Sequence, residues 1–382
     1  MREPRSRLDE LNNIILNVAN KSEGQLDLDN LPDTQLKLPL SVLDSVPLSF
    51  RDTPVEFSLV HGFDYFSPGM TAVILGGNNR VLNYIAAKNT APGGRVINCF
   101  THTSHLEQTH AAFNRLPTNQ LSALEFCYTP RGDLKTRYSE LEAFLEKHTI
   151  DKIADYLQLE NYIFDMRRKN PLIEDNLVDI VAVDVPNCQI SNDDFWNLAA
   201  DVYRILKRGG IFLFSLFVSD EKAGEEGYLW ENDLDRFTAS YKFHGFQWLG
   251  RSQLPHRVIN GKEIRCHNFA VFKGKEGPCM ERKQALIYNG PWREVRDDDG
   301  HVFPRGKRVA VCDKTFNVMS SPPYKDQFTY LHPYMDIPPE QAAPFPCAGG
   351  TLFRHPKVTK GVIEDEWTTQ DEGCDPDDDC CS

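Results

Sequence analysis

The clearest hydrophobic pattern in the chain spans residues 178–216 and predicts a strand, a helix and a second strand. Residues 178–183 form a short, mostly β-branched apolar run, which is typical of a strand buried on both faces. The next apolar residues recur at three- and four-residue spacing and predict one buried helix face: Phe195, Leu198, Val202, Ile205 and Leu206. Gly209 or Gly210 is expected to end this helix, and residues 211–216 form the second apolar run. The pattern predicts a parallel βαβ unit with a right-handed crossover.

A second stretch with the same alternation lies earlier in the chain. It predicts two strands with a helix between them, at residues 71–75, 81–88 and 95–100. Gly76 and Gly77 follow the first strand. Glycines let the backbone approach a ligand, and the start of the next helix offers free N–H donors. We therefore expect a nucleotide-like cofactor to contact Gly76, Gly77, Asn78 and Thr101.

The remaining patterns are shorter. Residues 101–172 are expected to be helical and polar, with a core-facing stripe formed by Leu141, Phe144, Leu145 and Ile150. The other predicted elements are helices at 6–20, 234–243 and 314–319, and strands at 248–250, 267–272, 285–288 and 308–312.

Composition and charge limit the classes of function. The 382 residues are 41% hydrophobic and 25% charged, as in a soluble globular protein. No apolar run approaches the roughly 20 residues needed to span a bilayer. The first residues lack the features of a signal peptide, so we expect a cytoplasmic protein. The net charge of −13 argues against nucleic acid and anionic membranes as partners.

Ten cysteines are scattered along the chain, and a role as small, reduced core residues is the default interpretation. Cys312 ends a predicted strand, where a core role and a thiol-site role are equally supported. Cys374, Cys380 and Cys381 lie in an acidic tail that is expected to be disordered in isolation, and together they could present soft thiolates to a soft ion. Asp297, Asp298 and Asp299 with His301 are interpreted as a rigid turn in preference to a cation site.

Two motifs support a resemblance to a known family. The segment that ends the central helix contains Tyr203, Arg204, Leu206, Lys207, Gly209 and Gly210. It resembles the late half of class I S-adenosylmethionine methyltransferases, and the pair Asn187–Cys188 narrows the resemblance to the arsenite methyltransferases. A later segment resembles the C-terminal domain of that family. The matching residues are Tyr288, Asn289, Gly290, Asp299, Phe303, Gly306, Val311, Thr315 and Phe328.

The resemblance implies an α/β fold. A class I methyltransferase (Rossmann-like) sheet with helices on both faces would be followed by a small β-rich C-terminal domain and the disordered acidic, cysteine-containing tail. The expected boundaries are 1–60 for an N-terminal extension, 61–273 for the methyltransferase-like domain, 284–335 for the C-terminal domain and 336–382 for the Pro-rich and acidic tail.

The resemblance also implies an activity. S-adenosylmethionine would donate a methyl group to a small-molecule or metalloid substrate such as As(III) held by thiolates. Cys188 would be the catalytic metalloid ligand, Cys312, Cys374, Cys380 and Cys381 would be further thiol ligands, and a thiol reductant would regenerate the site.

The sequence departs from the family at several positions, which leaves two hypotheses. Leu75 precedes the glycine turn where the family has an aspartate, and no acidic residue follows Phe100. A family cysteine before Cys99 is absent, and Gln247 occupies the position of another. The first hypothesis is a divergent methyltransferase with an open pocket beside residues 76–79. The second is a catalytically inactive fold that binds a metalloid or a partner, with side chains such as Phe100 or Arg80 filling that pocket.

Overall fold

The structure is a computed structural model in which two compact units can be distinguished. It describes residues 24–25, 46–47, 50, 62–77, 79–116, 121–188, 192–222, 228–234, 242–252, 255–347 and 350–365. The N-terminal unit comprises residues 1–241 and 246–271, and the C-terminal unit comprises residues 242–245 and 272–382. The predicted helix at 6–20, most of the predicted helix at 234–243, and the site candidates Asn78, Cys374, Cys380 and Cys381 lie outside the described residues.

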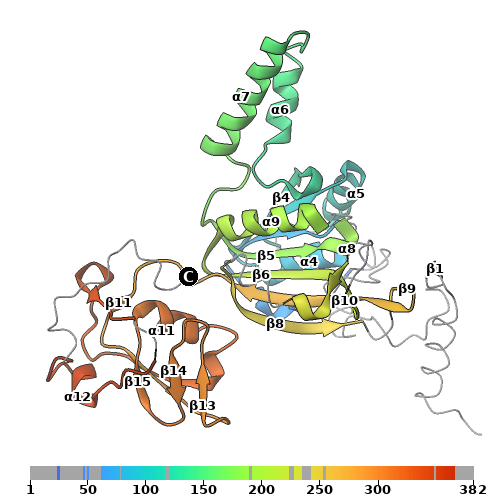
Figure 1. Cartoon of the computed structure of the whole chain (residues 1–382). Helices are drawn as coiled ribbons and strands as arrows, with labels where there is room; N and C mark the ends of the chain where they lie inside the picture. Colours follow the sequence, from blue (N-terminus) through green and yellow to red (C-terminus); the bar gives the residue numbers. More distant parts are fainter. Residues whose placement is uncertain are drawn as a thin grey trace, which may run out of the picture. The chain divides into compact units, whose positions relative to one another are not determined.

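One mixed sheet organises the N-terminal unit (Figure 1). Its strand order is β1-β9-β10-β6-β5-β2-β3-β4, with β7 beside β6 and β8 beside β10. The strands are β1 (Gly24–Gln25), β2 (Thr71–Leu75), β3 (Arg95–Phe100), β4 (Ala123–Tyr128), β5 (Val178–Asp184), β6 (Leu206–Ser219), β7 (Leu229–Trp230), β8 (His244–Arg251), β9 (Arg257–Ile259) and β10 (Lys262–Phe272). The five strands from β4 to β6 in this order pair in parallel.

The strand order identifies the fold. If β2, β3, β4, β5, β6, β8 and β10 are numbered one to seven, the order is 3-2-1-4-5-7 with the sixth strand beside the seventh. This is the arrangement of the class I methyltransferase fold, so the predicted fold is confirmed. The chain leaves β2 for β3 on one side and returns to β5 on the other. Ligands of doubly wound sheets bind at the carboxyl ends of strands beside such a switch point.

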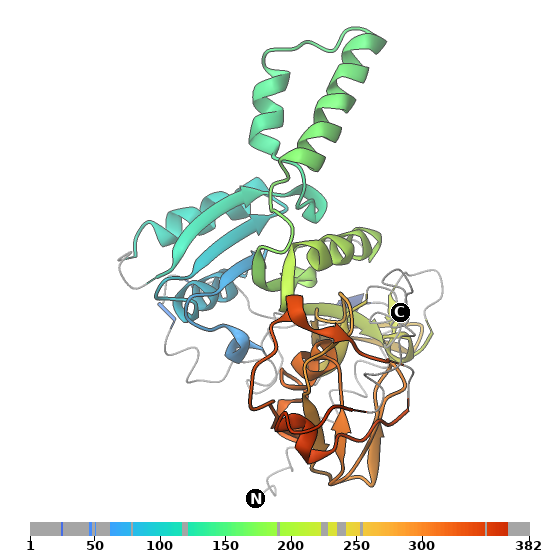
Figure 2. The same ribbon diagram turned by 90° about the vertical axis from the view of Figure 1, so that its left-hand side faces the viewer.

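Helices flank the sheet, as Figures 1 and 2 show. The helices of this unit are α4 (Arg80–Asn89), α5 (Thr103–Phe113), α6 (Tyr138–Leu145), α7 (Ile153–Lys169), α8 (Val185–Cys188) and α9 (Asn192–Ile205). Strands β2 and β5 are almost fully buried, which explains their apolar sequences. None of the helices among the described residues is both long and apolar enough to cross a membrane.

Two predicted local features were wrong. The central helix ends at Ile205, and the following Lys-Arg-Gly-Gly segment lies in β6. Val178 pairs with Leu206 whereas Ile180 pairs with Ile211, so the segment between these two partners bulges out of the ladder. Residues 101–172 also contain a strand, β4, which pairs with β3.

The predicted core stripe on residues 141–150 is also wrong. Helices α6 and α7 form an antiparallel pair that extends away from the sheet (Figures 1 and 2). No residue of α6 is buried, and Leu145 and Ile150 are exposed. The apolar side chains of α6 instead meet those of α7, where the rings of Phe144 and Tyr162 stack with their centroids 4.2 Å apart.

The C-terminal unit is small and rich in short strands. They form the pair β11 (Met280–Glu281) with β17 (Ala343–Pro344), the sheet β15 (Arg308–Ala310), β12 (Ala285–Tyr288) and β16 (Phe328–Leu331), and the hairpin β13 (Glu294–Arg296) with β14 (Val302–Pro304). Among the described residues of this unit, two α-helices accompany them, α11 (Asp313–Met319) and α12 (Pro356–Thr359). Tyr288, Phe303 and Phe328, which carry the C-terminal resemblance, pack together in its core.

Candidate functional site

The predicted glycine turn lies at the switch point between β2 and β5. Gly76 and Gly77 turn the chain between β2 and α4, and Gly77 has a left-handed φ of 53°. Asn79 caps α4, because its side-chain oxygen accepts a hydrogen bond from the Leu82 N–H at 3.0 Å. The structure therefore places the glycine turn and the start of a helix at the same edge, as the sequence predicted.

A buried carboxylate that the sequence analysis did not select lies beside this turn. Asp184, the last residue of β5, accepts hydrogen bonds from the Asn79 amide at 2.9 Å and the Ser215 hydroxyl at 3.0 Å. Its side chain is fully buried. The sequence did contain a signal for Asp184, which is an acidic residue directly after an apolar run. If such a residue is buried, it needs polar partners nearby.

Cys188 occupies the space between this carboxylate and the glycine turn. Its thiol donates a hydrogen bond to the Leu75 carbonyl at 2.9 Å, and its own carbonyl accepts one from the Thr101 hydroxyl at 2.7 Å. The residue is 0% exposed. Burial, followed by the nearby Asp184 carboxylate, raises the pKa of the Cys188 thiol well above its ordinary value. Cys188 is thus a neutral, hydrogen-bonded thiol here, and it belongs to none of the three-ligand groups found among the described residues.

The edge has two features that fit a polar cofactor. A Cβ atom on Gly76 would lie 3.0 Å from the side-chain oxygen of Asn83, so a larger residue there would require the Asn83 side chain to shift. Neither amide atom of Asn83 has a hydrogen-bond partner among the described residues, although the side chain is fully buried. An unpaired buried amide beside a glycine turn is a group that a bound polar molecule could satisfy.

The end of β3 fits the cofactor less well. Phe100 is fully buried and its ring stacks on that of Phe126, with centroids 6.4 Å apart. The polar side chain that follows is Thr101, which is partly exposed. A hydroxyl therefore occupies the position at which an acidic residue ordinarily binds ribose hydroxyls.

A second candidate site lies in the C-terminal unit and consists of three cysteines. The Sγ atoms of Cys279, Cys312 and Cys347 all lie within 4.8 Å of one another. We call this group the thiol cluster. Only Cys312 was a predicted ligand, and the structure gives it two partners that the sequence analysis had treated as ordinary cysteines. No spacing motif links the three, so the sequence contained no signal that could have united them.

The electrostatics of the thiol cluster differ from those of Cys188. Hydrogen bonds from the thiols of Cys279 and Cys347 lower the pKa of Cys312. The Thr315 N–H also donates to the Cys312 sulfur at 3.4 Å. The hydrogen bonds shared with Cys312 and its charge raise the pKa of Cys279 to about 12, and hydrogen bonds to the other two sulfurs raise that of Cys347. Negative charge in the cluster is thus best stabilised on Cys312, where the other two sulfurs and the Thr315 N–H provide hydrogen bonds.

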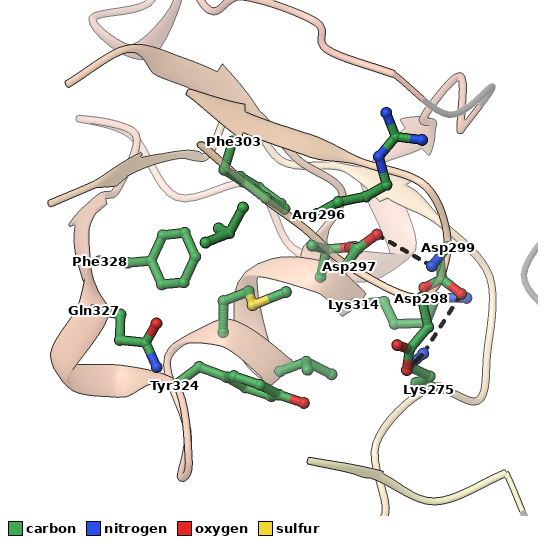
Figure 3. A pocket seen from close by; sticks show the side chains of 14 residues that line it. Lys275, Arg296, Asp297, Asp298, Asp299, Phe303, Lys314, Tyr324, Gln327 and Phe328 are labelled. Carbon is green, nitrogen blue, oxygen red and sulfur yellow. Dashed lines mark hydrogen bonds and ion pairs between the residues drawn. The ribbon is translucent and has the colours of Figure 1, made fainter. Parts of the chain in front are cut away.

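The acidic turn of the C-terminal unit lines a cavity of about 220 Å³ (Figure 3). Asp297 accepts hydrogen bonds from the backbone N–H groups of Asp299 at 3.1 Å and His301 at 2.8 Å, and its other oxygen lies 2.8 Å from His301 Nδ1. Lys275 pairs with Asp298 at 2.9 Å. The carboxylates thus already have protein partners, and the ligand atoms of Asp297, Asp299 and His301 also lie within 4.8 Å of one another.

One family profile and several solved structures are similar to this chain. A family profile described as "Domain of unknown function (DUF8838)" matches residues 275–363. No curated protein matches the sequence. Among solved structures, an arsenic(III) S-adenosylmethionine methyltransferase from Chlamydomonas reinhardtii is similar at 18% identity and a TM-score of 0.44, over 80% of this chain and 97% of that one. A SAM-dependent methyltransferase from Aquifex aeolicus is similar at 12% identity and a TM-score of 0.34, over 61% and 97% of the two chains. One from Methanosarcina mazei is similar at 13% identity and a TM-score of 0.33, over 55% and 95%.

Proposed function

We propose that the N-terminal unit is a divergent S-adenosylmethionine-dependent methyltransferase that transfers a methyl group to a thiol-bound metalloid such as As(III). The observation that supports it best is the position of the glycine turn. Gly76 and Gly77 end the first strand of a class I methyltransferase sheet, directly at its switch point. Cys188 follows the fourth core strand and its sulfur lies 2.9 Å from the Leu75 carbonyl, so acceptor and donor sites would adjoin.

Each residue of this edge has a role in the proposal. The backbone at Gly76 and Gly77 would approach the cofactor closely, the Asn83 amide would satisfy a polar group, and the Thr101 hydroxyl would bind the ribose. The bound cofactor supplies an electrophilic methyl group. Cys188 would hold the metalloid after its thiol leaves the Leu75 carbonyl and loses its proton. The protein itself mainly contributes proximity and orientation.

The alternative is a catalytically inactive fold, and a specific observation favours it. The polar side chains at the ends of β2, β3 and β5 already have protein partners. Asn79 donates to Asp184, Thr101 to the Cys188 carbonyl and Cys188 to the Leu75 carbonyl. Phe100 is fully buried. In that case the protein would act as a thiol, metalloid or partner-binding protein. The difference between the two hypotheses is whether the edge opens to admit the cofactor.

Calorimetric titration of the reduced full chain with S-adenosylmethionine tests the proposal. We expect micromolar binding that Gly77→Ala weakens at least tenfold. Gly93→Ala is the matched control, because Gly93 also has a left-handed φ, of 79°, but lies in the turn between α4 and β3 with open space around it. Absence of binding at millimolar cofactor would overturn the proposal in favour of the inactive fold.

The acceptor is tested separately with radiolabelled cofactor, arsenite and a thiol reductant. We expect methylated arsenic from the wild-type protein and none from Cys188→Ser. Cofactor binding without methyl transfer to arsenite would retain the methyltransferase and exclude this acceptor.

A further inference from the structure

Three segments that are distant in sequence converge to form the thiol cluster. Cys279 precedes β11, Cys312 follows β15 at the start of α11, and Cys347 follows β17. Antiparallel pairing of β11 with β17 fixes the first and third segments, and the Phe345 N–H donates to the Cys279 carbonyl at 2.8 Å. Backbone hydrogen bonds and a shared apolar cluster, which includes Ala310 and Phe345, therefore hold the three cysteines together.

The separation of the sulfurs suits one ion bound by all three. A Zn–S bond of about 2.3 Å in tetrahedral geometry places neighbouring sulfurs about 3.8 Å apart. The three Sγ atoms of the cluster lie within 4.8 Å of one another, so contraction by about 1 Å or less is sufficient. Changes in χ1 of the half-buried Cys279 and Cys347 can provide this movement without a change in the backbone.

The cluster is accessible from one side and has an open coordination position. Cys312 is 1% exposed, whereas Cys279 and Cys347 are only partly buried, so an ion can approach over the latter two. Among the described residues, no fourth cysteine, histidine or carboxylate joins the group. Three protein ligands suit either an ion that completes its coordination with water or a three-coordinate metalloid.

Simple core packing explains the cluster less well. Cys99, Cys188 and Cys266 are core cysteines that are at most 4% exposed, and none of them belongs to a three-ligand group among the described residues. Cys279 and Cys347, in contrast, are partly exposed and turn their sulfurs toward a third. One disulfide would also leave one thiol unused. Convergence of three sulfurs therefore points to a ligand.

We propose that Cys279, Cys312 and Cys347 form a three-thiolate site for a thiophilic ion, and that this site functions within the C-terminal unit without S-adenosylmethionine or Cys188. Zn²⁺ and As(III) share the required chemistry, and proton counts distinguish them. Binding of Zn²⁺ forms three Zn–S bonds and releases every thiol proton that the cluster carries. Arsenous acid exchanges three As–O bonds for three As–S bonds. Its three hydroxides take up three protons and leave as water, so Zn²⁺ releases three more protons than arsenous acid for any protonation state of the free cluster.

The test uses the full-length, reduced protein in which Cys374, Cys380 and Cys381 are replaced by serine, so that these thiols do not compete. Zn²⁺ is titrated against a chromophoric chelator, and arsenite is titrated separately while the sulfur–arsenic absorbance is recorded. In each titration, net proton exchange is measured in weakly buffered solution. We expect one ion per chain, no effect of added S-adenosylmethionine, and at least a hundredfold loss of affinity in Cys279→Ser, Cys312→Ser or Cys347→Ser.

Cys127→Ser is the matched control, because Cys127 is also a partly buried free cysteine but lies in β4. We expect it to bind as the parent does. Protection of Cys279 and Cys347 from alkylation by the bound ion gives a second readout that needs no mutation in the cluster. Equal binding by the cluster variants, loss of binding in Cys188→Ser, or binding of neither ion would overturn the proposal. None of these results depends on whether the N-terminal unit binds its cofactor.

Discussion

Cys188 and the thiol cluster present cysteine in opposite environments. Cys188 carries the sequence motif, yet its thiol is fully buried, donates to a backbone carbonyl and has a raised pKa. Cys312 carries no cysteine motif, yet its sulfur accepts a hydrogen bond from the Thr315 N–H, lies beside two other thiols and has a lowered pKa. A carbonyl neighbour favours the protonated sulfur, whereas N–H and S–H donors favour the thiolate. The chemistry of a cysteine therefore follows from its hydrogen-bond partners more directly than from its place in a motif.

The largest expected effect is a difference in alkylation rate between the thiol cluster and Cys188. At pH 7, iodoacetamide should modify the thiol cluster roughly tenfold or more faster than Cys188, because Cys279 and Cys347 are partly exposed and the cluster stabilises a thiolate, whereas Cys188 is fully buried and its pKa is raised. Mass spectrometry of timed digests gives the individual rates. Equal rates for Cys188 and the cluster would remove the distinction between the two environments.

The support of the cluster can be broken at Arg354. This side chain is fully buried, binds both oxygens of Glu281 at 2.8 and 2.9 Å and contacts Asp365. Arg354→Met should destabilise the C-terminal unit by about 3–5 kcal/mol, because it leaves two buried carboxylates uncompensated. Urea unfolding followed by hydrogen exchange of β12 peptides measures the loss.

An exposed ion pair supplies the comparison for that variant. Lys169 and Asp165 on α7 lie 2.9 Å apart, with 68% and 57% of their side chains exposed. Asp165→Ala should change the free energy of unfolding by less than about 0.5 kcal/mol. If Arg354→Met is equally mild, Arg354 does not anchor β11.

Acid should weaken the C-terminal unit through His244. Burial, followed by Lys275, lowers the pKa of His244 to about 4. A lowered histidine pKa means that the stability is fully present above pH 6.5 and is lost as the pH falls toward 4. Between pH 7 and pH 5 the loss should be about 2 kcal/mol. Hydrogen exchange of β12 at the two pH values measures it, and a pH dependence that persists in His244→Gln would contradict the assignment.

A modest effect on stability is expected at Cys188 itself. Cys188→Ala should lower the stability of the N-terminal unit by about 1–2 kcal/mol, because it leaves a small cavity and deprives the Leu75 carbonyl of its donor. Cys188→Ser should cost less, since the hydroxyl can still donate. Urea unfolding of both variants checks this order. A serine variant that is less stable than the alanine variant would show that the hydrogen bond does not contribute.

Much of the fold was predictable from local patterns. The strands Thr71–Leu75, Arg95–Phe100 and Ala285–Tyr288 have the bounds that their apolar runs indicated. Tyr288 and Phe303, which carried the C-terminal resemblance, proved to be core residues. The stripe on residues 141–150 misled because an apolar helix face shows that a partner exists but does not say which one. Its partner is α7 rather than the sheet.

The sequence by itself thus determined the strands Thr71–Leu75, Arg95–Phe100 and Ala285–Tyr288, the glycine turn and the class of fold. These follow from side-chain periodicity and backbone preference, which act over a few neighbouring residues. Only the tertiary structure decided that the Cys188 thiol is buried and donates to the Leu75 carbonyl, and that Cys312 lies beside Cys279 and Cys347. Such meetings depend on the register in which β11 and β17 pair and on the position of α11 beside them. Pairing of segments that are distant in sequence carries no local signature, and for this reason the thiol cluster became visible only once the chain was folded.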